Sequence, residues 1–446
     1  MDFWIKAAQF ILSLSILITL HELGHYVAAR IFKVRVEKFY LFFDPWFSLF
    51  KKKVGDTEWG IGWLPLGGYV KIAGMIDESM DKDQMAQPPK EDEFRSKPAW
   101  QRLIIMVGGV TVNVIFGFLI YIMVVNFWGE NVIQNDTLKY GLAINDDLKE
   151  LYDDLEDGDI ITAVDGEPVE NVGLINIQVF LRGKRELEVQ KPNGDKKIIQ
   201  LEENIDKWMW ENDAYMAFSP RVPIIVDSVM ANRHAATEGL QKGDSIVSIN
   251  GDSTPFFNNL QAKLQKEEVQ AKDSAQVIVG FYRGGEYQEL TTYINDQKTI
   301  GFSITNPDWL KITHLDFTFG ESIKRGFAKA GWTMSDYWNQ LPLIFTKKGA
   351  TSVGGFGTIG SLFPSAWNWQ VFWTTTAFIS LILAIMNILP IPALDGGHIM
   401  FLLYEIITGK EAPQKVLEYA QIIGFIILMA LFVYANGNDL YRYFFK

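Results

Sequence analysis

Long apolar segments constrain this chain more than any other feature of its sequence. The purely apolar part of the first, Ala7–Leu20, is short enough to resemble a signal peptide, but only Lys6 precedes it as a basic residue and no small-residue cleavage site follows directly. A helix needs about 20 residues to cross a bilayer. Four segments meet this length and predict a multi-pass α-helical membrane protein with four transmembrane helices: Ala7–Ala29, Leu103–Trp128, Val371–Leu389 and Val416–Ala435.

Lysine and arginine residues near the span ends predict the orientation of the chain, because cytoplasmic loops carry an excess of them. Lys410 and Lys415 lie in the short loop between the third and fourth spans. We therefore expect this loop and the one between the first two spans to be cytoplasmic, with the N-terminus and the long segment after the second span outside. The loop after the first span is the most basic, with Arg30, Lys33, Arg35, Lys38, Lys51–Lys53, Arg95, Lys97 and Arg102.

Composition excludes several classes of function. The net charge of −12 over 446 residues provides no basic surface to neutralise phosphates, which argues against nucleic-acid binding. The chain has no cysteine, so disulfides, thiolate metal sites and cysteine nucleophiles are excluded. Metal ligands must therefore come from carboxylates and from five histidines: His21, His25, His234, His314 and His398.

The long segment between the second and third spans contains an internal repeat. Leu155–Gly166 (LEDGDIITAVDG) aligns with Leu240–Gly251 (LQKGDSIVSING) at an offset of 85 residues. Each copy combines a Gly-Asp turn, an alternating strand and an Asp-Gly or Asn-Gly hairpin signal. Glu186–Gln190 and Val277–Tyr282 are predicted as later strands of the two copies. Any repeated β-rich domain would fit, and the shared pattern resembles more specifically the central strand of PDZ domains.

These patterns divide the chain into four predicted parts. Residues 1–131 form an N-terminal membrane part with two spans and an intervening β-rich loop. Residues 132–220 and 221–317 form two extracytoplasmic PDZ-like domains. Residues 318–446 form a C-terminal membrane part with an amphipathic helix followed by two spans.

The first span ends in the sequence His21-Glu22-Leu23-Gly24-His25. Two histidines four residues apart lie on one face of a helix, so both imidazoles can reach one Zn²⁺, and the adjacent glutamate can activate a bound water. Ionisable side chains at membrane depth are costly and usually functional. A polar helix end at the membrane interface is the bland alternative, but three ionisable side chains at ligand spacing favour a metal site.

Catalytic zinc usually has three protein ligands and a water. The favoured third ligand is Asp395, which follows Pro390 and Pro392 near the end of the third span. Non-helical backbone at membrane depth is tolerated where protein or a wet cavity surrounds it. Two alternatives stay open: Asp395 caps the following helix, or His398 is the third ligand. Because the first and third spans both run from outside to inside, the two motifs are expected near the same, cytoplasmic, membrane surface.

With these residues, the chain resembles the site-2 protease family of intramembrane zinc metalloproteases, and most of all the regulator of sigma-E protease branch with tandem PDZ domains. The resemblance covers nearly the whole chain. It is carried by H-E-x-G-H, by the repeated units and by three further stretches: Leu64–Lys71 (LPLGGYVK), Phe94–Arg102 (FRSKPAWQR) and Asn387–Gly396 (NILPIPALDG).

The resemblance implies roles for specific residues. His21, His25 and Asp395 are expected as Zn²⁺ ligands and Glu22 as the general base. Asn387 is expected to contact substrate or to steady the transition state. Gly60–Lys71 is similar to the family's membrane-reentrant β-hairpin, which would pair with an unwound substrate strand by β-addition. The residues expected at this surface are Gly60, Gly62, Gly67, Gly68 and Tyr69.

The function implied is regulated intramembrane proteolysis in a bacterial cytoplasmic (inner) membrane. Expected partners are the lipid bilayer and single-span membrane proteins, such as an anti-sigma factor or signal-peptide remnants after a first cleavage. A membrane-anchored zinc protease with an aqueous site would need a third His or Glu on a soluble helix, and none is suitably spaced. A catalytically inactive PDZ-bearing scaffold or receptor would be marked by damage to the ligand and base positions, which are all intact.

Overall fold

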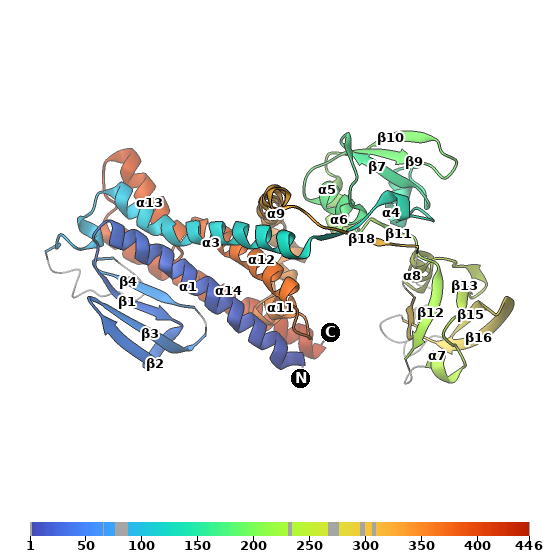
Figure 1. The fold of residues 1–446 in the computed structure, drawn as a ribbon, viewed down its shortest axis with the longest axis horizontal. Helices are drawn as coiled ribbons and strands as arrows, with labels where there is room; N and C mark the ends of the chain where they lie inside the picture. Colours follow the sequence, from blue (N-terminus) through green and yellow to red (C-terminus); the bar gives the residue numbers. More distant parts are fainter. Residues whose placement is uncertain are drawn as a thin grey trace. The chain divides into compact units, whose positions relative to one another are not determined.

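The computed structural model describes residues 2–65, 67–75, 88–230, 234–265, 276–294, 299–305 and 309–445. Leu66, within the Leu64–Lys71 stretch, therefore lies outside the described residues. The chain forms two compact units (Figure 1). One consists of Met1–Gly129 and Asp316–Lys446, and the other of Glu130–Leu315.

The first unit is mainly helical. Within the described part of the chain, four of its helices are long and apolar enough to cross a membrane. These helices are α1 (Asp2–Ile31), α3 (Ala99–Trp128), α12 (Trp369–Ile388) and α14 (Gln414–Phe445). The shorter helices are η1 (Phe94–Ser96), α9 (Phe319–Gln340), η5 (Leu341–Phe345), α10 (Lys347–Ser352), α11 (Phe356–Ser361) and α13 (Asp395–Thr408).

Helix α3 is the centre of this unit, because it packs against α1, α9, α12 and α13. The contact with α1 is made by glycines: a Cβ at Gly24 would lie 2.3 Å from the carbonyl oxygen of Gly108. Small residues let two apolar helices approach backbone to backbone, which replaces the hydrophobic driving force that lipid does not provide. The crossing of α1 and α3 lies one residue from His25 and thereby fixes the histidine helix against α3.

A four-stranded sheet follows α1 in the same unit, with strand order β2-β3-β1-β4. Its strands are β1 (Val36–Leu41), β2 (Phe43–Val54), β3 (Thr57–Leu64) and β4 (Tyr69–Ile72). Strand β1 pairs in parallel with β3 and antiparallel with β4, while β2 and β3 form the antiparallel hairpin.

The predicted hairpin over Gly60–Lys71 is therefore wrong. Strands β3 and β4 are neighbours in sequence but are separated in the sheet by β1. The segment between them contains Pro65, which has no N–H to donate to a strand ladder, and Gly67 with φ of 150°, which together favour a crossing connection over a tight turn. Strand β4 is consequently an edge strand.

The second unit begins and ends in the antiparallel pair β5 (Glu130–Ile133) and β18 (Ile312–Leu315). It contains two hydrophobic cores, one formed by residues between Leu138 and Phe218 and one by residues between Ile224 and Ile300. The unit is thus β-rich with two separate packing centres. The first centre is built by η2 (Asn135–Thr137), β6 (Leu142–Ile144), α4 (Asp146–Leu151), β7 (Ile160–Val164), β8 (Glu167–Pro168), η3 (Val172–Leu174), α5 (Ile175–Phe180), β9 (Glu186–Gln190), β10 (Lys196–Gln200), α6 (Ile205–Glu211) and β11 (Phe218–Pro220).

The second centre has a related plan, but its strands form one sheet. Its strand order is β16-β15-β13-β12-β17, with β14 pairing with β13. The first copy forms two sheets, β10-β9-β7-β8 and β11-β6. The elements of the second copy are β12 (Ile224–Val229), α7 (His234–Thr237), β13 (Ser245–Ile249), β14 (Asp252–Ser253), α8 (Phe257–Gln265), β15 (Gln276–Arg283), β16 (Glu286–Tyr293) and β17 (Phe302–Ile304).

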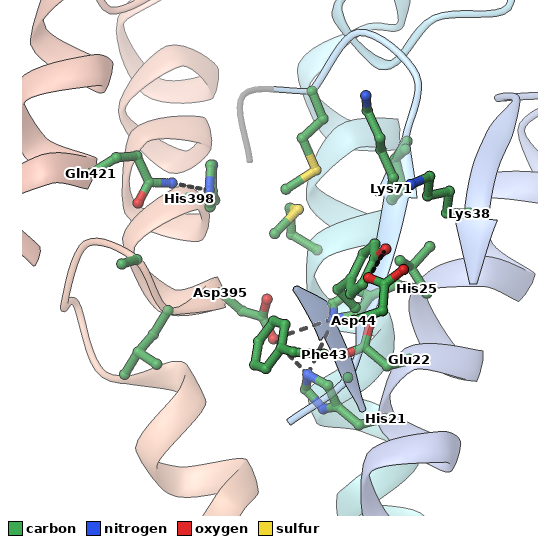
Figure 2. Close-up of a pocket in the computed structure, with 18 of the residues that line it drawn as sticks. His21, Glu22, His25, Lys38, Phe43, Asp44, Lys71, Asp395, His398 and Gln421 are labelled. Atoms are coloured by element: carbon green, nitrogen blue, oxygen red, sulfur yellow. Dashed lines mark hydrogen bonds and ion pairs between the residues drawn. The ribbon is translucent and has the colours of Figure 1, made fainter. Parts of the chain in front are cut away.

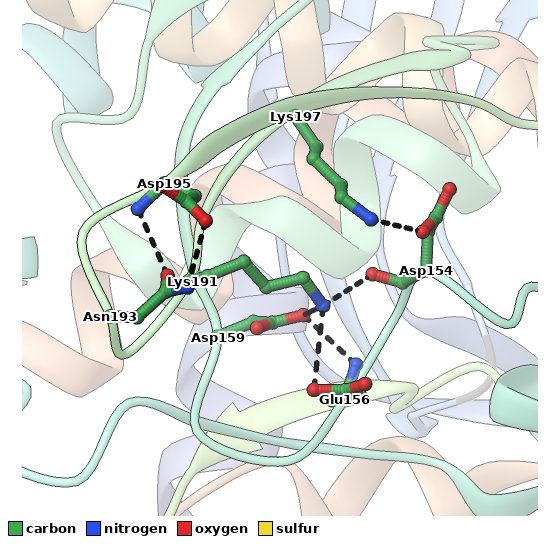
Figure 3. A network of polar contacts seen from close by, with 7 residues as sticks. All are labelled: Asp154, Glu156, Asp159, Lys191, Asn193, Asp195 and Lys197. Atoms are coloured by element: carbon green, nitrogen blue, oxygen red, sulfur yellow. Dashed lines mark hydrogen bonds and ion pairs between the residues drawn. The ribbon is translucent and has the colours of Figure 1, made fainter.

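The repeat seen in the sequence has one local geometry in both copies. Asp165 and Asn250 have φ of 48° and 51°, each before a glycine of positive φ, as a two-residue hairpin turn requires. Each Gly-Asp carboxylate pairs with a cation farther along the chain, directly after β9 in the first copy and at the end of β15 in the second. Asp159 receives Lys191 Nζ at 3.0 Å, and Asp244 receives Arg283 Nε at 2.7 Å. Figure 3 shows the first network, in which Lys191 also donates to a backbone carbonyl. These cations keep the buried turn carboxylates paired.

Candidate functional site

Helix α1 supplies three of the site residues. His21 and His25 are one turn apart, and their ring centroids lie 4.8 Å from each other. His25 is buried, with 6% of its surface exposed, although it lies on a helix that is otherwise rich in apolar residues. A buried polar side chain needs partners, so its surroundings indicate what it does.

The turn between α12 and α13 supplies the fourth site residue, Asp395. The chain leaves α12 at Ile388, turns through two prolines and begins α13 at Asp395. A Cβ at Gly396 would lie 2.0 Å from the carbonyl oxygen of Leu389, so only glycine permits the turn to close on the start of the helix. Ala393 has a φ of 72°, which is uncommon for a residue with a side chain. This turn directs Asp395 toward α1.

The donor atoms of His21, His25 and Asp395 converge (Figure 2). Asp395 Oδ2 lies 3.2 Å from His21 Nε2 and 3.3 Å from His25 Nε2, and the two Nε2 atoms are 3.3 Å apart. Ligands bound tetrahedrally to Zn²⁺ at 2.0–2.1 Å lie about 3.3 Å from one another. Asp395 Oδ2 is buried and, apart from these two imidazoles, has no hydrogen-bond partner among the described residues. The three residues therefore fit a zinc ion. Among the described residues, they are the group of His, Asp or Glu side chains whose ligand atoms lie close enough together to hold a metal ion.

Helix α3 orients both imidazoles from behind. His25 Nδ1 lies 2.9 Å from the carbonyl oxygen of Ile105, which can only accept a hydrogen bond. His25 therefore carries its proton on Nδ1 and turns a free Nε2 lone pair toward Asp395 and His21. Such outer contacts fix the tautomer of metal-binding histidines.

The second imidazole meets Asn113. His21 Nδ1 lies 3.2 Å from the side-chain nitrogen of Asn113, a residue that is 1% exposed. The side-chain oxygen of Asn113 has no hydrogen-bond partner in the part of the chain that the structure describes. Amide oxygen and nitrogen are interchangeable by a half-turn of the side chain. In the turned amide the oxygen accepts the Nδ1–H of His21, which satisfies that oxygen and leaves His21 Nε2 free for a metal.

Glu22 lies in the same cavity but outside the ligand triangle. Its carboxylate accepts a hydrogen bond from the backbone N–H of Val70 in β4. Val70 thus turns its N–H away from β1 and toward the site. The edge strand of the sheet and the glutamate of the motif are in direct contact, which places a backbone edge next to the reacting atoms.

A cavity of about 760 Å³ surrounds these groups. It is lined by α1, by β4, by the start of α13 and by the ends of β2 and β3 (Figure 2). Of the glycines expected at the substrate surface, Gly68 lines this cavity, as does Tyr69. Gly60 and Gly62 do not, and they serve packing: a Cβ at Gly60 would meet the Tyr40 ring at 2.3 Å, and one at Gly62 the Phe43 carbonyl at 2.1 Å.

Gly67 also does not line the cavity, and a Cβ on it would lie 2.9 Å from the Phe43 ring. The Tyr69 hydroxyl donates to Asp44 at 2.9 Å. Burial and the Asp44 carboxylate raise the pKa of Tyr69, so its phenol stays protonated. The hydrogen bond therefore connects the start of β2 to β4.

The remaining predicted residues lie near the ligands. Asn387 reaches the site from the end of α12, with its side-chain nitrogen 3.4 Å from His21 Nε2. His398, the rival third ligand, is outside the triangle and hydrogen-bonds to Gln421 of α14.

Sequence reasoning missed two contributors from α3. One is Asn113, and the other is Gly109, where a Cβ would lie 2.4 Å from His25 Nε2 and 2.7 Å from His21 Cε1. A lone asparagine and a Gly-Gly pair within an apolar span were the available signals, since both are polar or flexible at membrane depth.

A His-Glu-x-x-His helix whose imidazoles meet a carboxylate, set among helices able to cross a membrane, defines a membrane-embedded metallopeptidase. The sequence pattern of Peptidase family M50 matches residues 9–431, and the chain belongs to this family.

Curated relatives match over nearly their whole length. The regulator of sigma E protease of Haemophilus influenzae is 26% identical over 99% of this chain and 100% of its own. The protease RseP of Yersinia pestis is 26% identical over 98% of both chains. A putative zinc metalloprotease of Borreliella burgdorferi is 27% identical over 96% of this chain and 97% of its own. The predicted family and enzyme class, a zinc metalloprotease of the site-2 type in a bacterial membrane, are thereby confirmed.

Proposed function

We propose that this enzyme cleaves single-span membrane proteins within the bilayer, near the cytoplasmic face of the inner membrane. His21, His25 and Asp395 hold one Zn²⁺, and Glu22 is the general base. The observation that carries the assignment is the triangle of three donor atoms 3.2–3.3 Å apart, whose buried carboxylate oxygen has no partner among the described residues other than the two imidazoles.

The residues around the metal divide the chemical work. When bound, Zn²⁺ polarises the scissile carbonyl and lowers the pKa of its water. Glu22 accepts the proton of the attacking water and delivers it to the leaving amine nitrogen. Asn387, within 3.4 Å of His21, is close enough to the ligands to hydrogen-bond the substrate carbonyl as it becomes tetrahedral. Asn113 and the Ile105 carbonyl keep the imidazoles in the tautomer that binds metal.

Strand β4 presents the substrate. A transmembrane helix keeps its carbonyls in i→i−4 hydrogen bonds, so it must unwind before hydrolysis. The edge of β4, at Tyr69–Ile72, offers backbone groups that replace those lost on unwinding. Its Val70 N–H already contacts Glu22, so a strand added to this edge would bring its peptide bonds to the base. This edge takes the role first expected for a Gly60–Lys71 hairpin.

We assign four spans, to α1, α3, α12 and α14, with the N-terminus outside. Residues 1–131 and 318–446 are then the membrane part. Residues 132–220 and 221–317 are two PDZ domains outside the membrane, and no described residue in them has metal-ligand spacing. We propose that they exclude substrates with bulky external domains, so that an earlier cleavage licenses this one. Recruitment of substrate tails to raise their local concentration is the rival role.

The substrate class follows from this arrangement together with the relatives' names. Proteins called regulators of sigma E protease match 98–99% of the chain. We therefore propose an anti-sigma factor, or signal-peptide remnants, already trimmed by another protease. Substrates trapped on a Glu22→Gln variant in native membranes and identified by mass spectrometry would name the protein.

The cleavage position tests the proposal. The full-length enzyme, reconstituted with zinc and a trimmed single-span substrate, should cut inside the apolar segment, as read by the masses of both products. Products ending only in the aqueous flanks would contradict intramembrane cleavage and favour an aqueous site.

A further inference from the structure

A second cavity of about 250 Å³ adjoins the metal cavity at the end of the first unit that carries the basic loops. Three residues, Met75, His398 and Gln421, line both cavities, so the two cavities are neighbours. The partition contains the hydrogen bond between His398 and Gln421 (Figure 2). Neither side chain belongs to the metal ligands, and the chemistry described above does not use this second cavity.

Strand β4 leads from one cavity to the other. Its residues Tyr69–Ile72 line the metal cavity, and Gly74 and Met75, two and three residues after its end, line the second. A substrate strand paired with the open edge of β4 and continuing past Ile72 therefore arrives at the second cavity. Val70, which contacts Glu22, precedes Gly74 by four residues and Met75 by five. At about 3.3 Å per residue, the second cavity therefore lies roughly 13–17 Å along the strand from the base, which is about four or five positions.

The walls of this cavity combine apolar and charged surface. Phe94 of η1, Phe401 and Leu402 of α13 and Leu417 of α14 form the apolar part. The charged part is Arg102, which pairs with both Glu405 and Glu411. An apolar passage ending in charged groups suits a long side chain with an aliphatic stem and an ionised head.

The charge balance selects a cation. Arg95, the other guanidinium lining the cavity, is paired with the buried Glu93 at 2.7 Å. The cluster of Arg102 with two glutamates therefore holds one carboxylate in excess. Glu411 is 69% exposed and lies 3.2 Å from Arg102, so it can accept a further donor.

A second observation indicates a peptide. Arg102 Nε is buried and has no hydrogen-bond partner among the described residues, although its side chain lines the cavity. A guanidinium N–H can only donate, so its missing partner must be an acceptor. A backbone carbonyl of an extended substrate segment supplies one.

We infer that this cavity is a subsite for a lysine or arginine of the substrate, on the cytoplasmic side of the scissile bond. Lysine and arginine are the residues that flank membrane segments on that side. The inference rests on the proposed function in that the substrate adds to β4. It extends that function by naming a feature of the substrate that the enzyme recognises. This feature is a basic residue at a fixed distance from the scissile bond, bound by Glu411.

Binding to a non-cleaving enzyme tests the subsite apart from catalysis. Full-length, zinc-loaded Glu22→Gln protein in phosphatidylcholine vesicles is titrated with fluorescent single-span peptides whose one flanking lysine is moved residue by residue. At one position lysine should bind about two- to fivefold more tightly than alanine, as expected of a partly exposed ion pair. Glu411→Gln should abolish this preference, and Glu411→Lys should reverse it in favour of glutamate at the same position.

The control is Glu91→Gln, which removes another exposed carboxylate that does not line the cavity and should leave the preference unchanged. A lysine preference that survives Glu411→Lys, or no dependence on lysine position in any variant, would overturn the subsite. Cleavage of the same peptides by the parent enzyme is read separately. Its absence would count against the proposed function, while the binding ratios would still decide on the subsite.

Discussion

A methyl group added at Gly109 should disable the metal site from the side opposite the substrate. The Cβ of an alanine there would lie 2.4 Å from His25 Nε2 and 2.7 Å from His21 Cε1. Ordinary contact begins near 3.4 Å, so His25 must withdraw by about 1 Å, whereas metal–ligand distances are held within about 0.2 Å. Because the shift exceeds that tolerance several-fold, we expect zinc affinity to fall by at least 10- to 100-fold.

Stability should change far less than zinc affinity. Crowding of this kind lowers the free energy of unfolding by about 1–3 kcal/mol. Replacing a helical glycine by alanine raises it by up to about 1 kcal/mol, which offsets part of that loss. Gly331→Ala in α9 is the matched control, because no atom of the described residues outside its own helix turn lies within 4 Å of its added Cβ. It should bind zinc normally and unfold at the same or a slightly higher temperature.

Competition with a chelator of known zinc affinity, together with thermal unfolding, separates these outcomes. A Gly109→Ala enzyme that keeps the parent's zinc affinity would refute the reasoning, because the imidazoles would then not be where α3 confines them.

Three further predictions concern the ligands, the orientation and the PDZ-like units. Asp395→Ala should lower both zinc content and cleavage, while His398→Ala should retain zinc; full zinc in Asp395→Ala would make His398 the third ligand. The chain has no native cysteine, so single cysteines can be placed at Lys52 and Asn250 and treated with a membrane-impermeant thiol reagent in intact cells. The cysteine at position 52 should stay unlabelled and the one at position 250 should be labelled; the opposite pattern would invert the topology. Replacing residues 132–317 by a flexible linker should let untrimmed substrate be cut; loss of activity on trimmed substrate with zinc retained would instead establish recruitment.

The helical part of the fold was predictable because lipid imposes length and apolarity on every span. The predicted segments coincide with the long apolar helices α1, α3, α12 and α14, except that Leu389 lies one residue beyond the end of α12. The repeat was equally predictable, because the residues of each turn determine its backbone conformation locally. Asp165 and Asn250 both have a positive φ, of 48° and 51°. Glu186–Gln190 is a strand with those bounds.

Sheet order was not predictable from the sequence alone. Pairing of sequence neighbours is the commoner arrangement, and the hairpin that the family resemblance implied for Gly60–Lys71 would have followed it. Strand β1 lies between β3 and β4. Its place depends on where the chain leaves α1 and begins β1 at Val36, and no local sequence pattern predicts that position.

The candidate site was predictable where spacing determines geometry. Histidines four apart must share a helix face, and a carboxylate in a proline-broken span needs a partner. Asn113 and Gly109 could not be found in this way, because their roles depend on how α3 crosses α1. That crossing is fixed by backbone contact at Gly24 and Gly108, which involves residues far apart in sequence.

The Glu22→Gln variant tests the central claim most directly. Glu22 is outside the ligand triangle, and glutamine keeps its size but cannot accept the proton of the attacking water. Zinc content and cleavage of a reconstituted single-span substrate are measured on the same preparation. We predict about one zinc per chain, as in the parent, and no cleavage. Cleavage at the parent rate, or loss of zinc from the variant, would contradict the assignment of Glu22 as the base beside a His21, His25 and Asp395 metal site.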